Sequence, residues 1–157
     1  AFDFRFQGSN HRKIAAVFED RVEDFADYAK RFTQMKSDPG YMNGIIDLVF
    51  KQDGKYYLLD WKTNSLNRYE SAQLLDTMKD HNYILQYHIY LLALHLHLTN
   101  ILGIEYSYEK HFGGVYYLFL RGLDPESQSG VYFDRPSLEI IHKMESEWLL
   151  KKVPFYE

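Results

Sequence analysis

The sequence predicts an α/β fold in which a mixed central β-sheet is flanked by helices. Two apolar runs of strand length surround the dipeptide Asp53-Gly54, which is typical of a tight β-hairpin. Segments with apolar residues at three- and four-residue spacing lie on either side of this hairpin, as in amphipathic helices. Residues 115–120 form a continuous apolar run of the kind found in interior strands. The order strand, helix, hairpin, helix, strands, helix indicates a single domain over residues 1–157.

The segment before the hairpin contains one predicted strand and one predicted helix. Phenylalanine alternates with polar residues over residues 2–6, which indicates a half-buried strand. Residues 14–32 carry apolar side chains at helical spacing, which predicts one amphipathic helix, and residues 8–10 can cap it. The Ser-Asp-Pro-Gly sequence at residues 37–40 is expected to stop this helix.

The segment after the hairpin is predicted to contain both helices and strands. A helical region begins near residue 70, and its strongest part, residues 83–98, is apolar over most of its circumference, so we expect it to be buried against the sheet. The remaining predicted elements are a strand at 104–108, a turn or bulge at 111–114, an interior strand at 115–120, a polar loop at 122–130, a short strand at 131–133, and a closing helix whose first turn contains Pro136 and which runs to about residue 150.

The composition is that of an ordinary globular chain of 157 residues, 46% hydrophobic and 25% charged. The absence of cysteine excludes disulfides and thiolate metal sites and favours a reducing, cytoplasmic compartment. No run approaches the roughly 18 apolar residues of a membrane span, so we expect no membrane association. The net charge of −4 argues against a broadly phosphate-binding surface. Because the sequence begins at Ala1 rather than at methionine, we expect a piece of a longer polypeptide.

The predicted register of the hairpin brings two carboxylates together. If the loop is Asp53-Gly54 alone, Gln52 faces Lys55, and the continued ladder puts Asp47 directly opposite Asp60. Directly opposed Cβ atoms lie roughly 4.5–5.5 Å apart, and like charges there are destabilising. Apolar residues on both faces predict that the hairpin is buried on both sides. Two facing carboxylates in such surroundings need a cation, so the register predicts a metal site.

Lys62 lies one pleat further along on the predicted face of the two acids, and the three residues together could hydrolyse a phosphodiester. Mg²⁺ prefers oxygen ligands and is commonly held by one or two carboxylates together with substrate phosphates. The ion lowers the pKa of a bound water. The lysine can orient that water or stabilise charge in the transition state. The alternative is a surface hairpin in which exposed Asp and Lys side chains form only a cross-strand ion pair.

The hairpin motif, Gly44-Ile-Ile-Asp47 followed by Asp60-Trp-Lys62, resembles the bipartite signature of the PD-(D/E)XK nucleases. From about residue 44 to its end, the chain is also similar to the C-terminal nuclease domain of the RecB family, the helicase–nuclease subunits of RecBCD complexes. The similar segments are YYLLDWKTN at 56–64, LQYHIY at 85–90 with ALH at 93–95, and HFGGVYYLFLRG at 111–122. This resemblance implies a restriction-endonuclease-like fold.

The resemblance also implies roles for residues of the hairpin. Asp47 and Asp60 are expected to bind the metal through their carboxylates, and Trp61 through its backbone carbonyl. Lys62 is expected to be catalytic together with the two acids. The implied ion is Mg²⁺, and Ca²⁺ or Mn²⁺ are expected to be able to occupy the same site.

Gln86 and Tyr90 match the Q-x-x-x-Y element that follows the catalytic hairpin in RecB-like nucleases. Their spacing of four residues puts both on one face of a helix. With the hairpin beside them, we expect this pair to bind substrate. The alternative is that Tyr90 is a core aromatic residue and Gln86 a buried amide with its hydrogen bonds satisfied.

The function that the resemblance implies is an Mg²⁺-dependent deoxyribonuclease of the exodeoxyribonuclease V type. It would hydrolyse single-stranded DNA during double-strand-break repair and recombination. The implied partners are DNA, the RecC and RecD subunits, and the RecA recombinase. The alternative is a catalytically inactive nuclease-fold module that binds protein or DNA. The presence of both acids and the lysine favours the enzyme.

One part of the family's pattern has no match in this sequence. RecB-type nucleases take a further metal ligand, a histidine, from a helix upstream of the first core strand. The chain begins at what resembles that strand, so we expect a fragment that lacks the first core helix and holds its metal weakly. His11, Glu19 and Glu23 are candidates for the ligand by residue type only.

Overall fold

The structure is a computed structural model that describes residues 2–6, 11–19, 21, 25–32 and 40–149. The chain divides into two compact units, one made of Ala1–Gly44 with Ser137–Glu157 and the other of Ile45–Pro136. Each unit is described by itself. The expectation of one domain over residues 1–157 stays a prediction.

The described residues of the first unit form two strands and three α-helices. Strand β1 (Phe2–Phe6) pairs antiparallel with β2 (Gly40–Gly44), which confirms the predicted strand at the start of the chain. Its helices are α1 (His11–Glu19), α2 (Ala26–Phe32) and α6 (Leu138–Trp148). Aromatic side chains from all three helices pack around Phe18, whose ring centroid lies 5.2 Å from that of Tyr28, 5.6 Å from that of Phe32 and 6.2 Å from that of Trp148.

Two predictions for this unit are wrong in detail. The single helix predicted over residues 14–32 is two helices, α1 and α2, and the four acidic residues within 19–24 explain the interruption, because like charges four residues apart destabilise a helix. Pro136 lies before helix α6 rather than in its first turn. Ser137 caps this helix by accepting a hydrogen bond from the Ile140 backbone N–H, and the helix ends at Trp148. The predicted stop at residues 37–40 lies largely outside the described residues.

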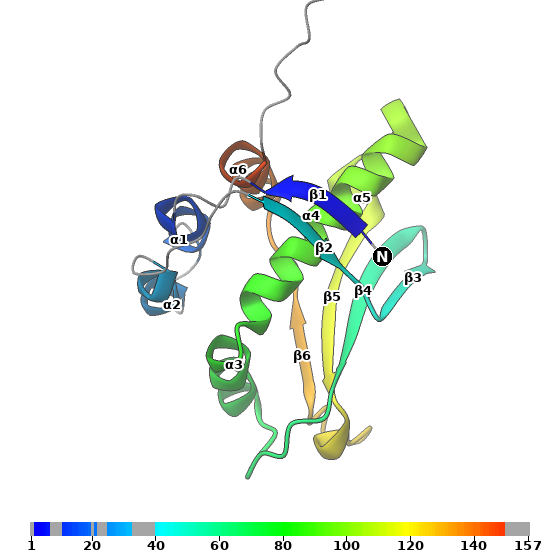
Figure 1. Ribbon diagram of the computed structural model, residues 1–157. Helices are drawn as coiled ribbons and strands as arrows, with labels where there is room; N and C mark the ends of the chain where they lie inside the picture. Colours follow the sequence, from blue (N-terminus) through cyan, green and yellow to red (C-terminus); the bar gives the residue numbers. More distant parts are fainter. Residues whose placement is uncertain (1, 7–10, 20, 22–24, 33–39, 150–157) are drawn as a thin grey trace, which may run out of the picture. The chain divides into compact units, whose positions relative to one another are not determined.

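The second unit is built on a four-stranded mixed sheet, as predicted. Its strands are β3 (Leu48–Gln52), β4 (Lys55–Lys62), β5 (Phe112–Phe119) and β6 (Val131–Asp134), in the spatial order β3-β4-β5-β6. Strand β4 is parallel to β5, whereas the β3–β4 and β5–β6 pairs are antiparallel. Strand β5 lies in the interior of the sheet, as its apolar run predicts (Figure 1).

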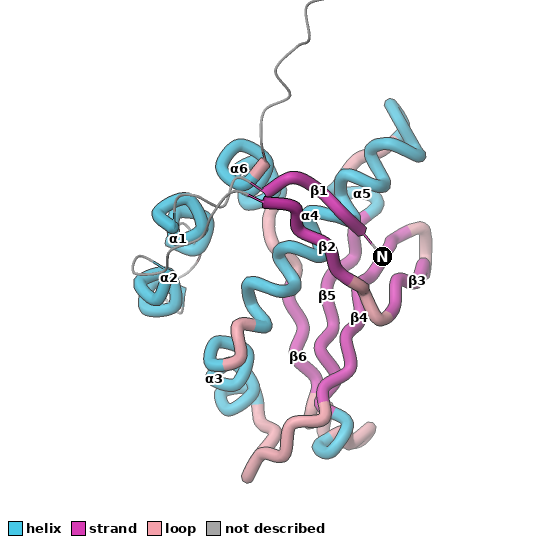
Figure 2. Tube along the Cα trace, in the orientation of Figure 1, coloured by secondary structure: helices cyan, strands magenta, loops and turns pink. Residues whose placement is uncertain are grey.

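Helix α3 (Ser71–Asp80) and the long helix α4 (Tyr83–Leu102) connect β4 to the segment before β5. Asn82, in the left-handed region with φ 56°, separates the two helices. Helix α4 crosses the sheet (Figure 2). The ring of its Tyr87 packs against that of Tyr117 on β5, with the two ring centroids 6.0 Å apart. This packing confirms that the apolar helix predicted at 83–98 is buried against the sheet.

The predicted hairpin register is confirmed over residues 48–59. Gln52 pairs with Lys55 and Leu48 with Leu59, and both loop residues have positive φ, 50° for Asp53 and 81° for Gly54, as a type I′ turn requires. The prediction that the hairpin is buried on both sides is wrong. Among the described residues, strand β3 pairs with β4 alone at the edge of the sheet, and two of its apolar residues are exposed, Leu48 at 41% and Val49 at 39%.

The strand predicted at residues 104–108 is also wrong. A 3-10 turn, η2 (Gly103–Glu105), and a short helix, α5 (Tyr108–His111), occupy this segment. Local hydrogen bonds account for the difference, because the Lys110 and His111 backbone N–H groups both donate to the Ser107 carbonyl. The bulge predicted at 111–114 is confirmed, since Gly113 is the extra residue between the Tyr56–Phe112 and Tyr57–Gly114 pairs.

Candidate active site

The two predicted acids approach each other, but not as a ladder pair. Asp60 lies in β4 and is 5% exposed. Asp47 is exposed and lies in a bend just before β3, one residue beyond the last pair of the ladder, Leu48 with Leu59. Asp47 Oδ2 accepts a hydrogen bond of 3.1 Å from the Trp61 backbone N–H. The expected direct opposition is therefore corrected to a contact between the Asp47 carboxylate and the backbone beside Asp60.

Lys62 lies beside Asp60, as the alternation of side chains along a strand predicts. It is 9% exposed, and its Nζ lies 2.6 Å from Asp60 Oδ2. The ammonium also donates a hydrogen bond of 3.0 Å to Gln86 Oε1. Strand β4 and helix α4 thus bring the acid, the lysine and the predicted substrate-binding amide together.

Gln86 connects the side chains of Lys62, Tyr117 and Tyr90 through both ends of its amide. Its Oε1 accepts hydrogen bonds from Lys62 and from the Tyr117 hydroxyl, the latter at 2.9 Å. Its Nε2 donates to the Tyr90 hydroxyl at 2.9 Å. Gln86 and Tyr90 share one face of α4, as their spacing predicts.

The carboxylates carry more negative charge than Lys62 offsets. Burial raises the pKa of the Asp60 carboxyl, Lys62 opposes that rise through its hydrogen bond and charge, and the Asp47 carboxylate adds to the rise. The pKa of the Tyr90 hydroxyl is raised as well, first by burial and then by the charges of Asp60 and Asp47. These mutual effects put the two acids and Tyr90 in one electrostatic environment that would stabilise a cation.

The oxygen donors of this site fit a divalent metal ion. Asp47 and Asp60 offer carboxylates, and Trp61 between Asp60 and Lys62 offers a backbone carbonyl, a donor set of the kind that Mg²⁺ accepts. Asp60 is buried with its pKa raised, so neutralisation of its charge would be favourable. In the part of the chain that the structure describes, no three His, Cys, Asp or Glu side chains are gathered in a way that could hold a metal. An ion held by the two carboxylates and the carbonyl would have further coordination positions open to water or substrate oxygens.

The candidates for an upstream ligand remain unplaced at this site. Glu19 is exposed at the end of α1. The side chain of His11 and the whole of Glu23 lie outside the described residues.

Two aromatic residues that sequence reasoning missed belong to the site. Lys62 Nζ lies 3.9 Å from the centroid of the Tyr83 ring and 4.9 Å from that of Tyr117. Tyr83 could have been found, because it precedes Gln86 by three residues and so shares its helical face. Tyr117 pairs with Asp60 in the parallel ladder, a register that no local sequence signal specifies.

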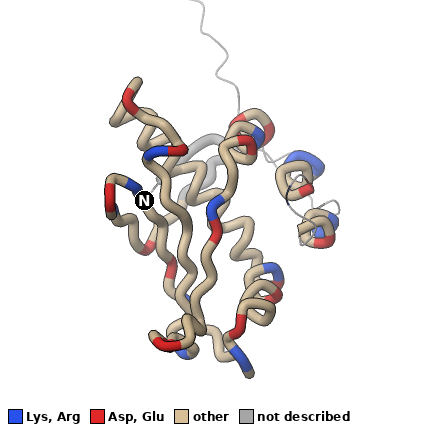
Figure 3. The backbone as a smooth tube through the Cα atoms, turned by 180° about the vertical axis from the view of Figure 1, so that it is seen from behind, with Lys and Arg blue, Asp and Glu red and all other residues tan. Residues whose placement is uncertain are grey.

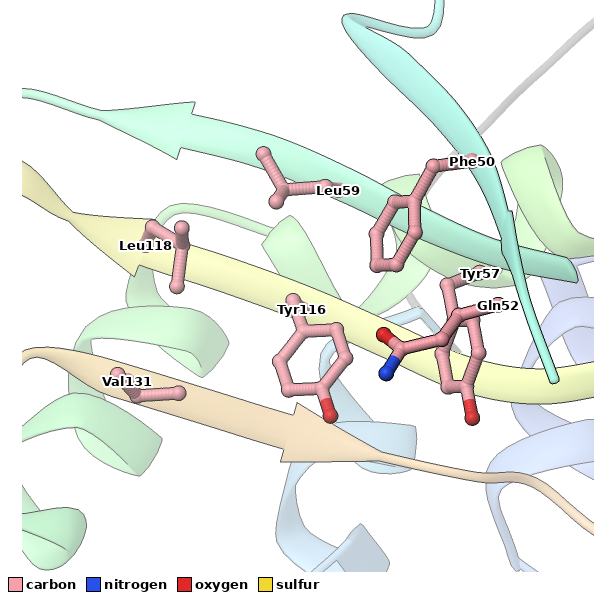
Figure 4. A pocket seen from close by; sticks show the side chains of 7 residues that line it. All are labelled: Phe50, Gln52, Tyr57, Leu59, Tyr116, Leu118 and Val131. Carbon is pink, nitrogen blue, oxygen red and sulfur yellow. The ribbon is translucent and has the colours of Figure 1, made fainter. Parts of the chain in front are cut away.

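A hollow also lies over the sheet, but on the other face. It is lined by alternate residues of the four strands, which point away from the face of Asp60 and Lys62 (Figure 4). These residues are Phe50, Gln52, Tyr57, Leu59, Tyr116, Leu118 and Val131. Seen from behind, strand β5 is tan along its length, because none of its residues is charged (Figure 3). The hollow therefore lacks the charged groups that the predicted chemistry needs.

Comparison with known proteins agrees with this geometry. Residues 4–148 match the profile of the PD-(D/E)XK nuclease superfamily. The chain belongs to this superfamily. This assignment and the mixed sheet between helices confirm the restriction-endonuclease-like fold predicted from the sequence.

Three relatives are RecBCD enzyme subunits RecB. The chain is 48% identical to the Escherichia coli subunit over 111 residues, 46% identical to the Haemophilus influenzae subunit over 116, and 37% identical to the Borreliella burgdorferi subunit over 136. The alignments cover 68%, 71% and 80% of this chain, but only 9%, 10% and 11% of the relatives. The predicted resemblance to the RecB nuclease domain is confirmed. Within the described ranges, no helix has both the length and the apolar character needed to cross a membrane.

Proposed function

We propose that this chain is the metal-dependent nuclease domain of a RecB-like protein and hydrolyses phosphodiester bonds of single-stranded DNA. One observation carries the proposal: Asp47, Asp60 and Lys62, the residues of the nuclease signature, meet at one place, with Lys62 Nζ 2.6 Å from Asp60 Oδ2. Gln86 and Tyr90 join them from α4 through a chain of hydrogen bonds. We propose Mg²⁺ as the ion, with Ca²⁺ or Mn²⁺ able to bind at the same place.

The carboxylates of Asp47 and Asp60 and the carbonyl of Trp61 would hold the ion. When bound, Mg²⁺ supplies a water of lowered pKa and neutralises charge on the phosphate. Lys62 directs its ammonium into the same site and can stabilise the negative charge that develops on the phosphoryl oxygens. Gln86 and Tyr90 lie beside Lys62, where an amide and a hydroxyl can donate hydrogen bonds to a phosphate group of the substrate.

The wider setting of the reaction is part of the same proposal. The similarity to RecB subunits supports an enzyme of the exodeoxyribonuclease V type that acts in double-strand-break repair and recombination in the cytoplasm. It likewise supports RecC and RecD as neighbouring subunits, and we propose that the RecA recombinase docks on this domain. An inactive nuclease-fold module is the competing possibility, and the retained acids and lysine favour the enzyme.

Cleavage of a 5′-labelled single-stranded oligonucleotide in Mg²⁺ tests the proposal. We expect Asp60→Ala and Lys62→Ala to lose about 100-fold or more of the cleavage rate, because each removes a charge that the transition state needs. EDTA should abolish cleavage and added Mg²⁺ should restore it. Asp76→Ala, which removes an exposed carboxylate of α3, should cut like the wild type. Equal cleavage by the wild type and Asp60→Ala would refute the nuclease assignment.

A further inference from the structure

The ammonium of Lys62 lies against the faces of two tyrosine rings that the nuclease signature does not include. Tyr83 is the first residue of α4, and Tyr117 lies in the middle of β5. Their ring centroids are 5.8 Å apart, and Lys62 Nζ lies within 5 Å of both, at 3.9 Å and 4.9 Å. A cation is attracted to the face of an aromatic ring, most strongly where water is excluded. At 9% exposure, Lys62 is in such a place.

We propose that Tyr83 and Tyr117 are positioning residues for the Lys62 ammonium in the cleavage reaction. The inference rests on the nuclease function proposed above and adds to it the residues that hold the lysine. The Tyr83 ring contacts the ammonium from helix α4, and the Tyr117 ring contacts it from strand β5. Asp60 and Gln86 bind two of the N–H groups of the ammonium.

A lysine needs such support because its side chain is long and flexible. It carries a compact charge on a four-carbon stem, and side chains of this kind lose considerable rotamer freedom when they are fixed. The ion pair with Asp60 and the hydrogen bond to Gln86 restrict the ammonium from one side. Contact with the Tyr83 and Tyr117 rings restricts the ammonium further, so that it has a defined position before the substrate binds.

Tyr117 holds the lysine in a second way, through Gln86. Its hydroxyl donates to Gln86 Oε1, the same oxygen that accepts from Lys62 Nζ. The Tyr117 side chain is fully buried, and its backbone pairs with Asp60 in the β4–β5 ladder. Tyr117 therefore holds in place the Gln86 oxygen that accepts a hydrogen bond from Lys62, and its own ring also contacts the ammonium.

The Tyr83 ring is itself held in place at the end of β4. Its hydroxyl donates a hydrogen bond of 3.2 Å to Asn64 Oδ1, and its ring stacks on that of His81 with centroids 5.3 Å apart and planes inclined by 16°. Asn64 follows Lys62 by two residues. The ring that faces the ammonium is thus tied to the segment that carries the lysine.

The competing explanation is ordinary core packing, and Tyr108 provides a matched control for it. Tyr108 is also a buried tyrosine, at 3% exposure, and it stacks on Phe112. Its hydroxyl donates to the Pro136 carbonyl at 2.6 Å, and its ring meets the Arg135 guanidinium instead of Lys62. Truncation of Tyr108 should cost folding stability as truncation of Tyr117 does, but should leave the lysine in place.

The experiment compares Tyr83→Leu, Tyr117→Leu, Tyr117→Phe and Tyr108→Leu in the full chain, at a temperature where thermal unfolding shows every variant to be folded. The rate of single-turnover cleavage of a labelled single-stranded oligonucleotide is measured in Mg²⁺, and the affinity of the protein for the same oligonucleotide is measured in Ca²⁺. We expect Tyr83→Leu and Tyr117→Leu to slow cleavage about 10- to 100-fold and to change DNA affinity by less than about twofold, because they displace a reacting group rather than a binding one.

The conservative variant separates the two actions of Tyr117. Tyr117→Phe keeps the ring and loses the hydrogen bond to Gln86, so it should recover a large part of the cleavage rate that Tyr117→Leu loses. Tyr108→Leu should lower the unfolding temperature and cleave at the wild-type rate.

Two other outcomes would overturn the inference. Equal slowing by Tyr117→Leu and Tyr108→Leu would mean that core packing alone explains Tyr117. A loss confined to DNA affinity would make the tyrosines binding residues. The cleavage rate of Asp60→Ala, measured in the same experiment, distinguishes a failure of the positioning role from a failure of the nuclease proposal. If Asp60→Ala is inactive while the tyrosine variants cut normally, only the positioning role fails, whereas an active Asp60→Ala removes the nuclease function itself.

Discussion

Lys62 Nζ and Asp60 Oδ2, 2.6 Å apart, form an ion pair that should affect folding as well as the proposed reaction. Asp60 is 5% exposed, and burial together with the nearby Asp47 raises the pKa of its carboxyl. The charged form of Asp60 is therefore disfavoured in the folded protein, and Lys62 is the cation that opposes this effect. Loss of the lysine would leave a buried carboxylate beside another acid.

We expect Lys62→Met to destabilise the metal-free protein by about 3 kcal/mol, because removal of one partner leaves the other charge buried and uncompensated. Urea denaturation in EDTA measures this change in the free energy of unfolding. The double variant Lys62→Met/Asp60→Asn should recover most of the loss, since both charges are then absent. Additive losses in the double variant would contradict the argument.

At the residue scale, local spacing was enough to predict that Asp60 lies beside Lys62 and Gln86 beside Tyr90, because alternation along a strand and the four-residue repeat of a helix determine which side chains share a face. The position of Asp47 was predicted less well. The ladder ends at Leu48, and the chain bends there, which a register argument does not capture.

At the scale of elements, the loop that follows β4 is held by Tyr69. The Tyr69 hydroxyl donates to the Asn64 carbonyl at 3.0 Å and accepts from the Leu66 backbone N–H at 3.1 Å. Gly122, at the end of the turn η3 (Leu120–Gly122), lies against this ring, and a Cβ atom there would overlap Tyr69 Cγ. The absence of a side chain at Gly122 therefore lets the loop after the catalytic strand pack closely.

We expect Gly122→Ala to destabilise the protein by about 1–3 kcal/mol, the usual cost of an extra carbon in a filled space. Thermal unfolding measures the loss. In a Tyr69→Ala background, where the ring that obstructs the new methyl group is absent, the same substitution should cost little more. An equal cost in both backgrounds would place the strain somewhere other than at the ring.

Elements defined by a local signal were predictable, and elements that depend on distant pairing were not. The turn at Asp53-Gly54 specifies the register of β3 on β4 by itself. The parallel pairing of β4 with β5 joins segments separated by three α-helices and the 3-10 turn η2, so nothing local to either strand specifies it. That pairing is what brings Tyr117 beside Asp60, which explains why the sequence did not reveal this tyrosine.

At the scale of the whole molecule, the charge of the chain limits how it can bind DNA. The formal net charge is −4, so the molecule as a whole repels a polyanion. The carboxylates of the exposed Asp47 and the buried Asp60 add to this repulsion at the place where the proposed reaction requires the scissile phosphate to bind. If the chain binds DNA as proposed, the missing positive charge has to come from a metal ion held by these acids.

The affinity for single-stranded DNA should therefore depend on a divalent cation, and the acids should determine that dependence. We expect weak binding in EDTA and tighter binding as Ca²⁺ is added, measured by fluorescence anisotropy of a labelled oligonucleotide. Asp47→Asn/Asp60→Asn removes two negative charges without a change in size. This variant should bind DNA more tightly than the wild type in EDTA, because repulsion falls, and should respond little to Ca²⁺, because the carboxylates that hold the ion are gone. If the double variant gains as much affinity from Ca²⁺ as the wild type does, the ion acts elsewhere on the protein or on the DNA, and Asp47 and Asp60 are not its ligands.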